Sequence, residues 1–114
     1  MAITEHASGT RATGTPPESQ FAPLGSSGDT ASGIFVLMVD TSNMQRGDQI
    51  EIQLTAKVIS SGSEVTVWET TLANQQDEPL FVSPTHLLLH GWTYQLRQTL
   101  GVSRNFNWSI RRVA

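Results

Sequence analysis

The chain has 114 residues, of which 38% are hydrophobic and 15% are charged, and its formal net charge is −3. This composition predicts one domain of ordinary core size and argues against a nucleic-acid-binding protein that relies on bulk positive charge. The absence of cysteine excludes disulfides and thiolate metal sites. The sequence has neither an apolar run that could span a bilayer nor the start of a signal peptide, so we expect a soluble protein made in the cytoplasm, without a membrane partner.

Residues 1–33 differ in composition from the rest of the chain. They are rich in Ala, Gly, Ser, Thr and Pro and contain few large apolar side chains. Such a segment cannot bury enough apolar surface by itself to offset the entropy lost on ordering. We therefore expect an extended arm over residues 1–33, held preferentially by a partner subunit and otherwise folded back on its own domain, with Ile3, Phe21 and Leu24 as its anchors.

Residues 34–114 carry the patterns of a β domain. The apolar run 34–40 predicts a strand that is covered on both faces and central in its sheet. Residues 49–58 alternate strictly between polar and apolar side chains, which indicates a half-buried antiparallel strand. The turn residues 60–63 then predict a hairpin with the β-branched run 64–72.

The second half of this domain continues with short strands. Residues 80–82 predict a brief strand that Pro84 ends, and residues 85–90, which carry leucine on both faces, fit either a brief strand or one helical turn. Bulky and polar side chains alternate in residues 91–99 and 104–111, which predicts a C-terminal hairpin that closes the fold. Six or seven short strands without a helical segment favour an antiparallel β-sandwich, with a small barrel as the second possibility.

The alternation in this predicted hairpin turns its aromatic side chains inward and its polar side chains outward. An outward row of arginines suits pairing with carboxylates of a neighbouring protein better than stacking on nucleic-acid bases. We therefore predict no nucleic-acid partner. The expected residues of a protein interface are Arg97, Arg104, Arg111 and Arg112.

No residue set in the sequence matches an enzyme site. The serines lie in turn clusters, no glycine-rich phosphate loop is present, and Glu51, Glu64 and Glu69 fit a solvated sheet face. His86 and His90 have the spacing of a metal pair on a helix but lack a third ligand. The sequence thus predicts no catalytic residues, no cofactor and no metal.

Trp68 leaves two alternatives open. On a strand it points away from Val65 and Val67. If the valines face the core, Trp68 is exposed and available to stack on a sugar, as in a carbohydrate-binding β-sandwich module. If Trp68 packs in the core, the valines lie outside.

The block from residue 33 to residue 112 also contains a recognisable series of short sequence segments. Its marks are VD at 39–40, RGDQIEI at 46–52, KV at 57–58, YQLRQT at 94–99 and FNW at 106–108. In these segments the chain resembles small virion-associated proteins of tailed bacteriophages, which are encoded among head and tail structural proteins. The resemblance covers about 80 residues and includes no catalytic or ligand motif.

This resemblance implies an assembly protein whose partners are the major capsid protein or other virion proteins. An extended arm on a compact sandwich is similar to capsid cement or decoration proteins, whose arms lie over seams between capsid subunits and which often form trimers. We therefore expect a trimeric cement protein on the capsid surface of the virion, bound through its arm and its sandwich. A head–tail connector or tail component, and a carbohydrate-binding module, are the alternatives.

Overall fold

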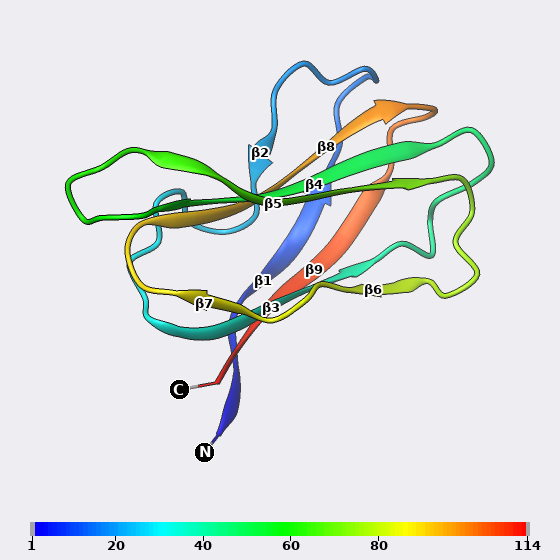
Figure 1. The fold of residues 1–114 in the computed structure, drawn as a ribbon. Coiled ribbons are helices and arrows are strands. Elements are labelled where there is room, and N and C mark those ends of the chain that lie inside the picture. Colours follow the sequence, from blue (N-terminus) through cyan, green and yellow to red (C-terminus); the bar gives the residue numbers. More distant parts are fainter. Residues whose placement is uncertain (1, 114) are drawn as a thin grey trace.

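Nine β-strands build the fold in the computed structural model, which describes residues 2–113 (Figure 1). Residues 1 and 114, at the ends of the predicted arm and domain, lie outside the described residues. In chain order the strands are β1 (Ile3–Ala12), β2 (Ala22–Pro23), β3 (Gly33–Asp40), β4 (Gln49–Lys57), β5 (Glu64–Ala73), β6 (Leu80–Val82), β7 (His86–Leu88), β8 (Trp92–Leu100) and β9 (Asn105–Val113).

The strands form two antiparallel sheets that pack face to face, which confirms the predicted antiparallel β-sandwich (Figure 1). One sheet has the order β1-β9-β3-β6, and the other has the order β2-β8-β4-β5. β6 pairs with the C-terminal half of β3, and β7 pairs with its N-terminal half. The segment 85–90 therefore contains a brief strand and not a helical turn.

The core lies between the inward faces of the two sheets, where the alternation of the sequence places large apolar side chains. Burial of one such side chain contributes about 1.5–3 kcal/mol, so this pattern is the main driving force of the fold. Its buried members are Leu24, Phe35, Leu37, Val39, Met44, Ile50, Ile52, Leu54, Leu88, Trp92, Tyr94, Leu96, Phe106 and Ile110.

β3 is central in its sheet, as predicted, because it lies between β9 on one side and β6 and β7 on the other. The expectation that both of its faces are covered is wrong. Phe35, Leu37 and Val39 are buried, whereas Val36 and Met38 on the outer face are only partly buried.

The predicted C-terminal hairpin is also wrong, because within residues 2–113 β8 and β9 do not pair with each other. β8 pairs with β2 and β4, while β9 pairs with β1 and β3 in the opposite sheet. Residues 101–104 cross from one sheet to the other. The inward orientation of the aromatic side chains was nevertheless predicted correctly, since Tyr94 and Phe106 are fully buried.

The N-terminal segment, expected as an arm outside the sandwich, completes both sheets instead. β1 pairs with β9 from Ile3 opposite Val113 to Ala12 opposite Asn105, and β2 pairs with β8. Sheet edges supply the backbone partners that a segment poor in apolar residues cannot supply for itself. The expected boundary between residues 33 and 34 is therefore not a boundary of the folded unit.

Side chains explain why β1 fits against the sheet edge. A Cβ atom on Gly9 would lie 3.2 Å from the Trp108 ring, so glycine allows the indole to cover the strand at this position. Ala7 is also small and packs against the core. Small residues thus let β1 pack closely on Trp108, in a segment whose composition suggested an extended arm.

A polar network holds the loop between β1 and β2. Glu18 accepts hydrogen bonds from the backbone N–H groups of Gln98 at 2.8 Å and Gly14 at 2.9 Å, and from Arg11 at 2.7 Å. Burial raises the pKa of Glu18, but these hydrogen bonds outweigh burial and hold the pKa below its ordinary value. Thr13 donates to the buried Gln98 side chain at 2.6 Å.

Candidate functional site

The β4–β5 hairpin projects beyond β7 at one end of the sandwich (Figure 1). A hollow with a mainly apolar lining lies between residues of β4, β5 and β7. We call it the β5–β7 cleft. It has a volume of about 460 Å³. Its lining residues are Leu54, Ala56, Lys57, Val58, Val67, Thr85, His86, Leu87 and Leu88.

Large apolar side chains stand exposed in and beside this cleft. Leu87 is 83% exposed, Val58 is 77% exposed and Val67 is 50% exposed. Ile59, which follows Val58, and Leu89, which follows β7, are exposed as well. Several exposed apolar side chains gathered around one hollow are typical of a binding site for another molecule.

A β-bulge explains why Val67 faces the cleft. Leu54 pairs with Trp68, but the next residue of β4, Thr55, pairs with Thr66, so Val67 is an extra residue in β5. The two residues of such a bulge share one face of the sheet. The strict alternation expected for β5, with Val67 pointing away from Trp68, is therefore interrupted at this position.

Trp68, the neighbour of Val67 on β5, is not an open platform. It is partly buried and packs against the core, with its ring centroid 6.2 Å from that of Phe81 and 5.3 Å from that of His86. Of the two alternatives that the sequence left open, this geometry fits core packing with exposed valines.

His86 lines the cleft and contacts Tyr94, which is buried behind it. His86 Nδ1 lies 2.7 Å from the Tyr94 hydroxyl oxygen. Burial lowers the pKa of His86 and raises the pKa of Tyr94, so both groups are neutral at pH 7. The pair offers one hydrogen-bonding group to a bound molecule and presents no charge to it.

The structure does not bring the four predicted interface arginines together. Arg97 lies 2.6 Å from Glu51 and stacks over the Phe21 ring at 4.4 Å. Arg104 lies 2.8 Å from Asp48, and Arg112 donates to the Ser32 carbonyl oxygen. These three arginines thus bind groups of their own chain.

Arg111, the fourth, is exposed on the outer face of the β1-β9-β3-β6 sheet, where its Nε donates to Ser109 Oγ at 3.2 Å.

The three predicted arm anchors are likewise separated. Leu24 is buried in the core of its own sandwich, and Phe21 is partly buried against Arg97. Ile3 is exposed on β1. These residues therefore do not form a common surface for a partner subunit, because two of them pack within the fold.

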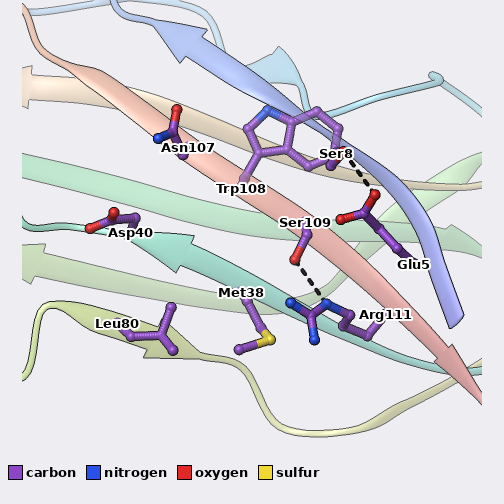
Figure 2. A pocket seen from close by; sticks show the side chains of 9 residues that line it. All are labelled: Glu5, Ser8, Met38, Asp40, Leu80, Asn107, Trp108, Ser109 and Arg111. Atoms are coloured by element: carbon purple, nitrogen blue, oxygen red, sulfur yellow. Dashed lines mark hydrogen bonds between the residues drawn. The ribbon is translucent and has the colours of Figure 1, made fainter. Parts of the chain in front are cut away.

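A second hollow, of about 240 Å³, lies on the outer face of the β1-β9-β3-β6 sheet. Figure 2 shows that its polar side chains already engage one another: Ser8 donates to Glu5, and Arg111 donates to Ser109. The hydrogen bonds that Asp40 accepts from Ser42 hold its pKa below the ordinary value. We favour the β5–β7 cleft because its exposed apolar side chains gain more from leaving water.

The histidines do not meet in a metal site. His86 faces Tyr94, whereas His6 lies 2.7 Å from Asp29 near the N-terminal segment. Across residues 2–113, no group of three or more His, Cys, Asp or Glu side chains is placed to hold a metal ion.

Two features of the cleft differ in how far the sequence reveals them. The bulge at Val67 depends on cross-strand pairing and leaves no local signal. The run Leu87-Leu88-Leu89 did carry a signal, because leucine on both faces of a short strand requires one face to be exposed or covered by a partner.

Comparisons with known proteins add no family to this description. Neither a protein-family model, nor a curated protein, nor a solved structure matches the chain. In the part of the chain that the structure describes, no helix is long and apolar enough to cross a membrane.

Proposed function

We propose that the chain is a non-enzymatic structural protein that attaches to a larger protein assembly through the β5–β7 cleft. The observation that carries this proposal is the exposure of Val58, Val67 and Leu87 around one hollow. Burial of these side chains against a partner removes apolar surface from water, which is the main source of binding free energy between proteins.

The virion is the proposed setting of this assembly. The resemblance to virion-associated proteins of tailed bacteriophages supports a capsid cement protein that binds the major capsid protein, with a head–tail connector or tail component as the alternative. The strands β1 and β2 complete the sandwich, so the cleft takes the attachment role that we expected of a free arm. A trimer on the capsid surface stays a prediction, and multiple copies on a shell would add avidity.

Sugar stacking on Trp68 has less support. The indole packs against Phe81 and His86, and a sugar needs one open face of the ring.

Purified particles from the producing host test the proposal. We expect the wild-type chain to be present on heads, measured by quantitative mass spectrometry, and Leu87→Glu to be lost because a charge in the cleft opposes apolar burial. Leu100→Glu is the matched control, since Leu100 is also exposed but lies at the far end of β8.

Two results would contradict this function: absence of the wild-type chain from particles, or wild-type occupancy by the folded Leu87→Glu variant. Recovery in the tail fraction would favour the connector or tail component over the cement protein.

A further inference from the structure

The strand β5 forms a free edge directly beside the cleft. It has 10 residues, and among the described residues it pairs only with β4. Its other side therefore presents unpaired backbone N–H and C=O groups that can bind a further strand. A strand that pairs with this edge would therefore lie beside the apolar cleft.

Charge is distributed unevenly around this edge. Residues 58–96 contain four acids, Glu64, Glu69, Asp77 and Glu78, and no Lys or Arg. Glu64 is turned into its sheet, where it accepts from Thr55 at 2.7 Å and from Thr93 at 2.9 Å. Glu69 is exposed on the outer face of β5, whereas Asp77 and Glu78 lie in the loop at the far end of this strand, and Lys57 lines the cleft. Glu69 is therefore the exposed carboxylate of the β5 edge and can attract a positive charge there.

We propose that the β5–β7 cleft binds an extended segment of a partner protein in which apolar residues alternate with Lys or Arg. The inference rests on the proposed function and specifies its partner. The segment adds to β5 as an antiparallel or parallel strand, and its apolar side chains enter the cleft beside Val67 and Leu87. Its basic side chains, on the opposite face of the new strand, lie next to Glu69.

The same charges argue against a second copy of the chain as the occupant. β5 contains Glu64 and Glu69 and no basic residue, so pairing of two β5 edges would bring acidic strands together. Like charges on paired strands are destabilising. The acids thus protect the edge from self-association and leave it open to a basic strand.

Synthetic peptides test this inference. The probe is a fluorescent peptide of alternating Lys and Val, and the controls are the same peptide with Glu in place of Lys and a backbone N-methylated form that cannot pair with an edge. We expect the basic peptide to bind about tenfold more tightly than either control by fluorescence anisotropy.

Variants of the chain locate the binding site. Val67→Glu and Leu87→Glu are expected to weaken binding of the basic peptide by about tenfold or more, while Leu100→Glu leaves it unchanged. Glu69→Lys is expected to reduce the preference for the basic peptide over the acidic one. All four positions are exposed, and circular dichroism checks that each variant is folded.

Several results would overturn the inference. Equal affinity for the basic and acidic peptides, or no effect of N-methylation, would exclude a basic added strand. Failure of every peptide to bind would exclude the site, and a concentration-dependent dimer lost in Val67→Glu would identify a second copy as the occupant. If the chain prefers the basic peptide but does not attach to particles, this inference stands and the virion setting is refuted. If the chain attaches to particles but does not prefer the basic peptide, the virion setting stands and this inference is refuted.

Discussion

Asp48 fixes the path of the chain between the two sheets. Its carboxylate is only 2% exposed and accepts hydrogen bonds from Gln45 N at 2.9 Å, Val102 N at 3.1 Å and Arg104 Nε at 2.8 Å. A Cβ atom on Gly101 would lie 2.0 Å from Asp48 Oδ1, and Gly101 has a positive φ of 95°, so only glycine fits there. These contacts direct residues 101–104 across the sandwich and prevent a hairpin.

The substitution Asp48→Asn is expected to lower the free energy of unfolding by about 2–3 kcal/mol. The amide lacks the negative charge that pairs with Arg104, and its NH2 group replaces one of the two oxygens that accept hydrogen bonds. Urea denaturation followed by tryptophan fluorescence measures this change. Asp77→Asn, in an exposed loop, is the control and should stay within about 0.5 kcal/mol of wild type. A loss as small as that of the control would show that Asp48 does not organise the crossing.

The same carboxylate predicts a dependence of stability on pH. Burial raises the pKa of Asp48, but hydrogen bonds from Gln45, Arg104 and Val102 outweigh burial and hold the pKa below its ordinary value of 3.8. A carboxylate with a depressed folded-state pKa stabilises the fold above its unfolded-state pKa, and this contribution is lost as the pH falls through the folded-state pKa. Between pH 5 and pH 2, wild type should therefore lose more stability than Asp48→Asn, and parallel losses would contradict this expectation.

At the scale of the elements, β1 and β2 are structural parts of the sandwich. Removing residues 2–24, which contain both strands, would uncover β9 and β8 along one edge of each sheet and would remove Leu24 from the core. An uncovered edge in both sheets exposes backbone groups and apolar surface at once.

Deletion of residues 2–24 is therefore expected to abolish cooperative unfolding. If these residues formed a separate arm, the shortened chain would instead stay folded. Leu24→Ala in the full chain should cost about 2–5 kcal/mol, as for other buried leucines. Ile3→Ala is the control, because Ile3 is exposed and its loss should cost no more than about 0.5 kcal/mol. A deletion variant with a wild-type denaturation curve would contradict this expectation and would show that residues 2–24 form a separate arm.

The elements also show what sequence periodicity can and cannot predict. Alternation located β4, β8 and β9 and identified their inward side chains, because burial on one face depends only on local sequence. It did not identify the partners of each strand, since pairing depends on groups far apart in the chain, such as Asp48 and Val102. β1 was missed because edge pairing uses backbone hydrogen bonds and small residues, as at Gly9.

The candidate site was less predictable than the fold. The leucines of residues 87–89 were visible in the sequence, but their position opposite Val67 depends on how the two sheets are stacked. The arginines were visible too, yet Arg97, Arg104 and Arg112 proved to bind groups of their own chain.

At the scale of the whole molecule, the two ends of the sandwich differ in chemistry. One end carries the β5–β7 cleft with its exposed apolar side chains, and the free β5 strand beside it carries the exposed Glu69 and no Lys or Arg. The other end carries the crossing loop held by Asp48 and Arg104. We therefore predict a docking surface for a basic, extended segment at the end that contains β7.

Nuclear magnetic resonance of the ¹⁵N-labelled chain during titration with the alternating Lys-Val peptide tests this central claim most directly. The predicted result is a set of amide shift changes confined to β5, β7 and the adjoining end of β4. Changes centred on Arg111 and the outer face of the β1-β9-β3-β6 sheet, or no changes, would contradict it.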